Sequence, residues 1–214
     1  MMSLGFYFNT VPRDFRLALR LVRQIRQHFG GVEIIAIPDG CSREFEALKP
    51  DCFVYPTTER LKRPGQVHLH CQRNLEAVLE HTTAKTLIQI DPDSYVTQAF
   101  DPPEADCFGV WFPCTFPDGE RLILHGGCWG ASRKLLEKMH SENVFTADKF
   151  DHPSNLRWDG SGLRDRGFAL AVQQVLPVSE WHPWTAFKTQ PGRVQQRPTT
   201  RNGVCIVHPN TSKA

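Results

Sequence analysis

Apolar and polar positions alternate along the first part of the chain with the periods of strands and helices. Residues 4–10 (LGFYFNT) and 32–37 (VEIIAI) are mostly apolar runs, and each predicts a buried strand. Between them, apolar residues recur at helical spacing up to the pair Gly30-Gly31, which predicts a helix that ends there. We expect the solvent-facing side of this helix to carry its arginines, among them Arg16, Arg20 and Arg23. A strand, a helix and a second strand predict a βαβ unit with parallel strands.

The same order of elements repeats between residues 52 and 90. Residues 52–56 (CFVYP) predict a short strand, residues 67–83 a helix, and residues 85–90 (KTLIQI) a further strand. This alternation predicts an α/β fold, a three-layer sandwich with a mostly parallel central sheet. Ligands of such sheets gather beyond the carboxyl ends of the strands. We therefore expect one edge of the sheet to carry the polar strand ends Thr10, Asp39 and Asp91.

The second half of the chain has a less regular pattern. Strands are predicted over residues 107–113, 121–127 and 203–207, and a helix over residues 132–141. Residues 161–178 are ambiguous, and we interpret them as a helix that breaks into a strand near its middle. Prolines and aromatic residues crowd residues 177–198, which indicates an ordered or ligand-covering loop. Since no repeat or linker divides the chain, we predict a single domain over residues 1–214.

Composition narrows the class of partner. The chain has 214 residues, with 25 Lys and Arg against 23 Asp and Glu, so its formal charge of +2 favours neither a nucleic acid nor a membrane surface as partner. No apolar run is long enough for an integral membrane segment. The seven cysteines include no CxxC pair, which indicates reduced core thiols and a cytoplasmic protein. A small-molecule ligand fits this composition best.

The segment Asp91-Pro92-Asp93 places two carboxylates where a buried strand ends. Two carboxylates about 4 Å apart repel each other by roughly 4 kcal/mol at an effective dielectric constant of about 20. Pro92 favours an extended backbone at Asp91, and in an extended chain both side chains point to the same side, about 6.6 Å apart. Such a pair suits a magnesium or manganese ion. The alternative is a turn whose aspartates accept hydrogen bonds from backbone amides.

Four segments resemble family-2-type glycosyltransferases with the glycosyltransferase-A fold. Residues 66–94 (QVHLHCQRNLEAVLEHTTAKTLIQIDPDS) are similar to the central block of that family, in which an Arg-Asn pair opens a helix and a DxD motif ends the next strand. The other three segments are IAIPDGCS (35–42), GGCWGASRKLLEKM (126–139) and RWDGSGLRDRG (157–167). The resemblance covers residues 4 to about 170. It implies a nucleotide-sugar-binding half over residues 1–100 and an acceptor-side half over residues 101–214.

The resemblance implies a metal-dependent transferase. It would move a sugar from a nucleotide-diphosphate sugar to a hydroxyl group of a carbohydrate or other acceptor, with inversion at the anomeric carbon. Manganese or magnesium would be held mainly by Asp93 and also by Asp91, which contacts the ribose or a metal-bound water. His208 would be a third metal ligand, since some members of the fold use a histidine from the C-terminal segment. The alternative for His208 is an ordinary surface histidine.

The same resemblance assigns roles in donor binding. Asp39 would read the nucleotide base, and Thr10 would contact the base or the ribose. Arg73 would pair with a phosphate, since its guanidinium matches two oxygens at once. From the residues alone, a solvent-facing ion pair is the alternative for Arg73, and a turn or capping residue is the alternative for Asp39 and Thr10.

On the acceptor side, the resemblance assigns Gly126, Gly127 and Trp129 to a loop close to the sugars and Asp159 to the catalytic base. At the position of this base the family usually has Glu-Asp, whereas this chain has Trp158-Asp159. The spacing from Asp159 to Leu163 and Arg166 is also one residue longer than in the family. Asp159 is therefore also compatible with a helix cap. This departure leaves a second hypothesis open, a non-catalytic nucleotide-sugar-binding protein.

Two further interpretations stay open at this point. A sugar nucleotidyltransferase shares the sheet and the metal, but the first strand is followed by NTVPRD (9–14) and not by a glycine-rich loop with a lysine. Trp181 and Trp184, together with His182, would either stack on an acceptor sugar or pack in the core.

Overall fold

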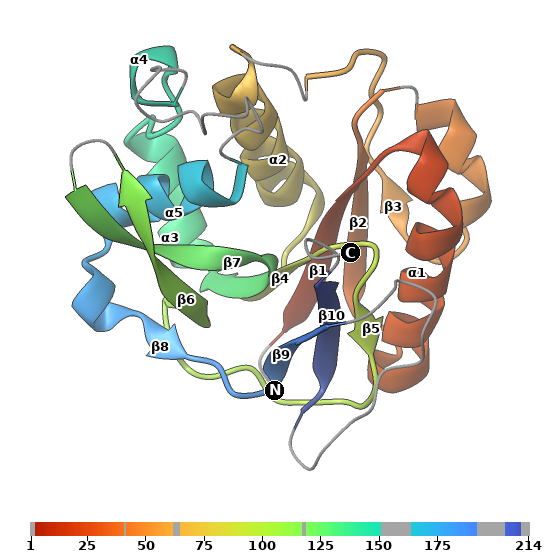
Figure 1. The fold of residues 1–214 in the computed structure, drawn as a ribbon. Helices are drawn as coiled ribbons and strands as arrows, with labels where there is room; N and C mark the ends of the chain where they lie inside the picture. The colour runs from red at the N-terminus through yellow and green to blue at the C-terminus, as the bar shows by residue number, and fades with distance from the viewer. Residues whose placement is uncertain are drawn as a thin grey trace.

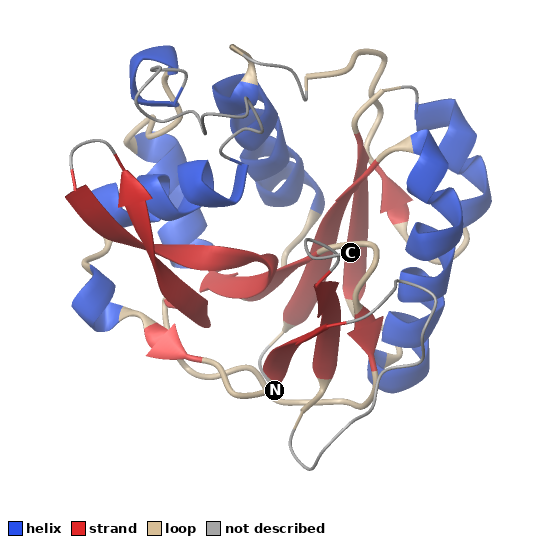
Figure 2. Cartoon of the chain, in the orientation of Figure 1, coloured by secondary structure: helices blue, strands red, loops and turns tan. Residues whose placement is uncertain are grey.

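A seven-stranded sheet forms the centre of the part of the chain that the computed structural model describes, residues 3–40, 42–61, 65–116, 119–150, 164–191 and 204–210 (Figures 1 and 2). Its strands lie in the order β3-β2-β1-β4-β7-β6-β8. Their bounds are β1 (Leu4–Thr10), β2 (Glu33–Pro38), β3 (Phe53–Val54), β4 (Thr86–Ile90), β6 (Cys107–Phe116), β7 (Gly119–Ser132) and β8 (His182–Pro183). Strand β7 is antiparallel to β4 and β6, and the other pairings are parallel. The predicted α/β fold with a mostly parallel sheet is confirmed.

Helices cover both faces of this sheet (Figure 1). Helix α1 (Phe15–Phe29) and the 3-10 helix η2 (Ser42–Leu48) lie on one face. The other face carries α2 (Val67–His81), α3 (Arg133–Ser141) and α5 (Arg164–Val175). The remaining short helices are η1 (Pro12–Asp14), α4 (Ala147–Phe150) and η4 (Val178–Glu180).

The central strands are apolar because both of their sides are buried. In β1, Phe6 and Phe8 pack beneath α1, while Tyr7 between them packs beneath α2. Strand β4 repeats this arrangement, with Leu87 on the α2 side and Ile88 on the α1 side. Successive strand residues point to opposite faces, so burial on both faces turns the usual apolar and polar alternation into a continuous apolar run.

A second, three-stranded sheet lies beside α1. It has the order β5-β10-β9 and consists of β5 (Tyr95–Val96), β10 (Ile206–Asn210) and β9 (Phe187–Pro191). Strand β5 begins directly after the Asp91–Ser94 segment, and Tyr95 and Val96 pair with Val207 and Ile206 of β10. The C-terminal part of the chain is thereby brought next to the end of β4.

Two expectations for the second half of the chain are wrong. The described part of residues 161–178 is helical from Arg164 to Val175 and contains no strand, because Ala171, Val172 and Val175 form one apolar helical face that packs in the core. Residues 177–191 form η4, β8 and β9, not a ligand-covering loop, and residues 192–198 lie outside the described part.

The tryptophans of this segment belong to the core. Trp181 and Trp184 are 4% and 5% exposed, and Trp184 packs edge-on against Phe108 with ring centroids 5.0 Å apart. Of the two interpretations given above, core packing is therefore the correct one. The neighbouring His182 is exposed on β8.

The described cysteines are core residues, as expected. Cys52, Cys71, Cys107, Cys128 and Cys205 are buried. Burial raises the pKa of Cys52 and of Cys107 to about 12, so both are neutral thiols at neutral pH. Cys41 and the side chain of Cys114 lie outside the described part. Among the described helices, none is long and apolar enough to cross a membrane.

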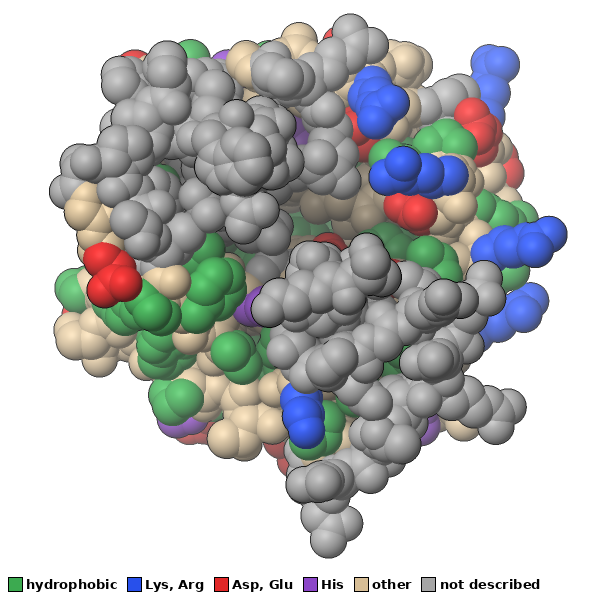
Figure 3. All heavy atoms as spheres, viewed as in Figure 1, with side chains coloured by type: hydrophobic (Ala, Val, Ile, Leu, Met, Phe, Trp, Pro, Cys, Tyr) green, Lys and Arg blue, Asp and Glu red, His purple; other side chains and the backbone are tan. Residues whose placement is uncertain are grey.

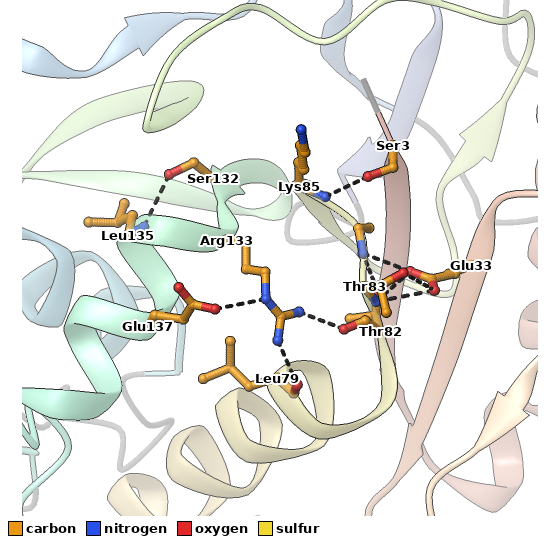
Figure 4. Close-up of polar contacts among 11 residues, drawn as sticks. Ser3, Glu33, Leu79, Thr82, Thr83, Lys85, Ser132, Arg133, Leu135 and Glu137 are labelled. Atoms are coloured by element: carbon orange, nitrogen blue, oxygen red, sulfur yellow. Dashed lines mark hydrogen bonds and ion pairs between the residues drawn. The ribbon is translucent and has the colours of Figure 1, made fainter. Parts of the chain in front are cut away.

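A polar junction joins α2, α3, β2 and β4 at the end of α2 (Figure 4). Arg133, at the start of α3, donates to the carbonyls of Leu79 (2.8 Å) and Thr82 (2.5 Å) at the end of α2. Glu33, at the start of β2, accepts from the amides of Thr83 and Ala84 and from the Thr82 hydroxyl. The Arg133 contacts satisfy carbonyls that the helix end leaves without intrahelical partners, and the Glu33 contacts hold the segment that follows the helix. Helix α2 is thus fixed relative to the sheet.

Replacement of Glu33 by Gln should lower the free energy of unfolding by about 1 kcal/mol at pH 7, since the partly buried carboxylate loses charge-assisted hydrogen bonds. Burial on its own raises the pKa of Glu33, but the bonds from Thr82, Thr83 and Ala84 outweigh it and hold the pKa below its usual value of 4.5. The stabilisation is therefore present above pH 4.5 and is lost as the pH falls through the lowered pKa.

Urea unfolding of both proteins at pH 7 and at pH 3 measures this difference. The exposed Glu44, replaced by Gln, is the control. An equal destabilisation by Glu33→Gln at the two pH values would contradict the assignment.

Candidate functional site

A cavity of about 430 Å³ lies at the carboxyl ends of β1 and β4. The molecule is hollowed near the middle of the face in Figure 3. The residues that line the cavity come from β1, η1, α1, α2, β4 and the turn after it, β7 and α5. They are Tyr7, Asn9, Thr10, Val11, Arg13, Asp14, Leu17, His70, Cys71, Asn74, Gln89, Asp91, Pro92, Asp93, Trp129 and Phe168. The edge of the sheet predicted to bind a ligand is therefore the edge that carries the cavity.

Asp91 and Asp93 both line this cavity, but on a turn and not on an extended chain. The Ser94 amide donates to the Asp91 carbonyl at 3.0 Å and closes a four-residue turn with Pro92 at its second position. The extended chain expected from Asp91 to Asp93 is wrong, because Pro92 and Asp93 are the two central residues of this turn, a position that the fixed φ of proline suits. The turn alternative is correct for the backbone. Gln89 Nε2 donates to Asp91 Oδ1 at 3.2 Å and orients that carboxylate.

The predicted acceptor-side loop belongs to β7 and touches this turn. The Gly127 carbonyl accepts from the Asp91 amide at 2.9 Å and from the Ser94 hydroxyl at 3.3 Å. Trp129 lines the cavity, and its ring lies 4.1 Å from that of Phe168, centroid to centroid. Gly126 also lies on β7. The structure thus brings Gly127 and Trp129 together with the aspartates.

Gly130, a further glycine of this loop, has a packing role. A Cβ atom at Gly130 would lie 2.0 Å from the ring of Phe108, far closer than van der Waals contact allows. The absence of a side chain at Gly130 therefore allows β6 and β7 to pair closely with Phe108 in the core.

Asp39 and Thr10 meet at the ends of two adjacent strands. The Asp39 amide donates to the Thr10 carbonyl at 2.8 Å, as expected for polar residues at neighbouring strand ends. The Asp39 carboxylate is buried and accepts from the Leu61 amide at 2.7 Å and from Arg73 Nη2 at 3.1 Å. Asp39 is not among the described residues that line the cavity.

Arg73 lies on α2 in a buried ion pair with Asp39. The alternative of a solvent-facing ion pair is wrong, because the pair is covered by the segment that includes Glu59, whose carbonyl lies 3.4 Å from Arg73 Nη1. The predicted contact between Arg73 and a phosphate stays a prediction. A buried guanidinium between a carboxylate and a carbonyl holds that carboxylate in a fixed orientation.

His70 lines the cavity one helical turn before Arg73 and was not predicted as a site residue. Burial and then the Arg73 cation lower the pKa of His70 to about 4, against the opposing effect of Asp39. His70 is therefore neutral at neutral pH and offers the cavity a hydrogen-bonding ring without charge. Its position three residues before Arg73 on a predicted helix was the only signal for it in the sequence.

Asp14, at the start of α1, is a third carboxylate at the cavity. It occupies the N-cap position, but its side chain makes no capping hydrogen bond. Burial raises the pKa of Asp14; Arg13 opposes the shift, and Asp93 and Asp91 add to it. Asp14 therefore lies within electrostatic reach of the aspartate pair.

Several buried oxygens in the cavity wall have no hydrogen-bond partner within the described part of the chain. Among them are Thr10 Oγ1, Asn74 Oδ1 and Gln89 Oε1, on side chains that are 3%, 8% and 8% exposed. A buried acceptor left without a partner costs about 1–3 kcal/mol, so these atoms fit a ligand that donates hydrogen bonds. Asn74 and Gln89 were not predicted as contacts.

The aspartate pair fits a divalent cation only together with further ligands. Within the described residues, no group of three or more His, Cys, Asp and Glu side chains is arranged to hold a metal ion by itself. Magnesium is commonly bound by one or two carboxylates with water and substrate phosphates at its other positions, which agrees with two aspartates on an open cavity. His208 lies on β10, but its side chain is outside the described part, as is the whole of Asp159.

One arginine of α1 departs from expectation. Arg16 and Arg23 are exposed, as predicted, whereas Arg20 is half-buried and donates to the carbonyl of Asp93 at 2.9 Å. The expectation of a solvent-facing Arg20 is wrong because the aspartate turn packs over this part of the helix. Helical periodicity placed all three arginines on one side and gave no signal for the difference.

Comparison with known proteins shows a shared fold. The chain matches no described protein family and no curated protein. Its structure is similar to the crystal structure of the glycosyltransferase GlyE in Streptococcus pneumoniae TIGR4, with a TM-score of 0.54 at 9% sequence identity. The similarity covers 86% of this chain and 46% of that glycosyltransferase, so the chain spans less than half of its length. At this identity the likeness establishes the fold.

The buried, neutral His70 should make the fold less stable as the pH falls. Its pKa of about 4 in the folded chain lies below its usual 6.5, so the unfolded chain takes up a proton first. The free energy of unfolding should therefore fall from pH 6.5 toward pH 4. Replacement of His70 by Gln should flatten this part of the profile, measured by urea unfolding at several pH values. The exposed His140, replaced by Gln, is the control, and an unchanged slope in His70→Gln would refute the assignment.

Proposed function

We propose that this protein is a metal-dependent glycosyltransferase of the three-layer glycosyltransferase-A type, resembling family-2-type DxD enzymes. It moves a sugar from a nucleotide-diphosphate sugar to a hydroxyl acceptor, with inversion. The observation that carries the proposal is the position of Asp91 and Asp93, which line one cavity at the carboxyl ends of parallel strands in a fold shared with a glycosyltransferase. The predicted cytoplasmic location is part of the same proposal.

The charge of the cavity supports a divalent cation. Its described lining has three carboxylates, Asp14, Asp91 and Asp93, against a single arginine, Arg13, whose side chain is largely exposed. Two negative charges about 4 Å apart repel by roughly 4 kcal/mol at an effective dielectric constant of about 20, so a diphosphate alone is disfavoured beside the aspartates. Manganese or magnesium would be held mainly by Asp93, with Asp91 and then His208 as further ligands. The bound ion stabilises the negative charge that develops on the leaving diphosphate.

The donor's nucleotide would lie toward Thr10 and Asp39. Asp39 is proposed to read an N–H edge of the base once the segment with Glu59 and Leu61 moves off its buried carboxylate, which Arg73 and the Leu61 amide hold in place. Thr10 Oγ1 has no hydrogen-bond partner within the described residues. Its hydroxyl group would accept a hydrogen bond from the base or the ribose, or donate one to it. Arg73 supports donor binding through Asp39, and a direct contact with a phosphate is the second part of its proposed role.

The acceptor would approach from β7 and α5. Trp129 and Phe168 form an aromatic wall of the cavity beside the aspartates, and sugar rings pack well on such surfaces. Gly127 holds the aspartate turn beside this wall through its carbonyl, and Gly126 precedes it on β7. Asp159 is the proposed general base that takes the proton of the acceptor hydroxyl as its oxygen attacks the anomeric carbon.

The second candidate is a non-catalytic nucleotide-sugar-binding protein. The observation in its favour is Trp158-Asp159 at the position where the resembled family has Glu-Asp. A sugar nucleotidyltransferase is disfavoured, since β1 is followed by NTVPRD (9–14) without a glycine-rich, lysine-bearing loop.

Replacement of Asp93 by Asn should weaken manganese-dependent binding of UDP or GDP by at least about tenfold, because the ion loses a charged ligand. Isothermal titration calorimetry with and without manganese measures the effect. The exposed Asp101, replaced by Asn, is the matched control. If Asp93→Asn binds as the parent does, the ion is not at this position.

Replacement of Asp159 by Asn should reduce sugar transfer by about two orders of magnitude or more while nucleotide affinity is nearly preserved, since a base acts in the transition state and not in donor binding. Transfer or donor hydrolysis with a panel of nucleotide sugars and manganese is the assay. Tight nucleotide binding by the parent without turnover of any donor would favour the non-catalytic protein. Full turnover by Asp159→Asn would place the base at another residue.

A further inference from the structure

Arg20 connects helix α1 to the backbone of the aspartate turn. Its Nη2 atom lies 2.9 Å from the carbonyl oxygen of Asp93, 3.1 Å from that of Ser94 and 3.5 Å from that of Pro92. One guanidinium nitrogen thus contacts three consecutive carbonyls, more than 70 residues away in sequence. These contacts of Arg20 fix the turn relative to the helix.

The ring of Tyr95 holds the guanidinium in position. Arg20 Cζ lies 3.8 Å from the ring centroid, within the range of a cation–π contact. Tyr95 is buried and directly follows the turn. The planar guanidinium therefore stacks on a fixed surface while its edge points at the carbonyls, a geometry that a lysine ammonium does not reproduce.

The opposite side of the turn is hydrogen-bonded to β7. There the Gly127 carbonyl accepts from the Asp91 amide and from the Ser94 hydroxyl. The turn is consequently held from α1 on one side and from the sheet on the other. Both sets of contacts involve backbone atoms or the Ser94 side chain. The residues Asp91 and Asp93 line the cavity.

We propose that Arg20 is a positioning residue for the Asp91 and Asp93 carboxylates, a role that rests on the proposed function of the pair as metal ligands. It sets the orientation of the turn and places a positive charge behind two carboxylates that repel each other. Residues that orient metal ligands without touching the metal commonly change metal affinity by about 10- to 100-fold when they are replaced.

The test compares Arg20→Met and Arg20→Lys with Arg23→Met, a matched change at an exposed arginine of the same helix. The first readout needs no metal: hydrogen exchange of the Ser94 amide, which closes the turn. We expect this amide to exchange about tenfold faster in Arg20→Met, with the amides of α1 and β4 unchanged. Arg23→Met should behave as the parent does.

The second readout is manganese affinity, measured by calorimetry in the presence of UDP or GDP. We expect Arg20→Met to weaken it about tenfold or more, and Arg20→Lys, which keeps the charge without the planar edge, to lie between Met and the parent. Faster Ser94 exchange together with weaker manganese binding supports the proposal.

Three results would overturn it. They are unchanged Ser94 exchange in Arg20→Met, faster exchange spread equally over α1 and β4, and unchanged manganese affinity despite a freed turn. If the parent binds no manganese, the proposed function fails separately, and Ser94 exchange alone then decides whether Arg20 holds the turn.

Discussion

The two hydrogen bonds that the Gly127 carbonyl accepts from the Asp91–Ser94 turn hold the two parts of the candidate site together. Strand β4 ends in this turn, and the antiparallel β7 passes beside it, so one carbonyl accepts from both the Asp91 amide and the Ser94 hydroxyl. The aspartates from the first half of the chain and Trp129 from the second half therefore line the same cavity. A site that needs a donor and an acceptor side by side depends on this contact.

Around this turn, the buried charges at α2 are paired with each other, and the cavity carries an excess of negative charge. Asp39 and Arg73 form a buried ion pair whose partners include backbone groups, as the desolvation of two charges requires. His70, beside them, is neutral because burial and Arg73 lower its pKa. Asp14, Asp91 and Asp93, in contrast, line an open cavity. The site thus has one part at α2 in which the charges of Arg73 and Asp39 neutralise each other, and an acidic part at the ends of β1 and β4.

The shared fold with a glycosyltransferase places the cavity but does not choose its ligand, since one scaffold hosts many activities. The choice depends on particular atoms, above all the aspartate carboxylates and the acceptor oxygens of Thr10, Asn74 and Gln89. These atoms are the ones on which the proposed hydroxyl-rich ligand and its cation depend. The rigid junction of Arg133 and Glu33 lies at the other end of α2, where it fixes the helix that carries Asn74.

The sequence by itself determined the elements of the first half and the edge of the sheet at which they present polar groups. Strand and helix periods are properties of neighbouring residues, so β1, α1, β2, α2 and β4 were predictable within a few residues, and so was the meeting of Thr10 with Asp39. The tertiary structure decided what each polar side chain faces. It made a turn of Asp91–Ser94, buried Arg73 on Asp39, and brought Asp14 and His70 to the cavity. It also separated Arg20 from Arg16 and Arg23, because burial and hydrogen-bond partners are set by segments far apart in the chain, which no local period encodes.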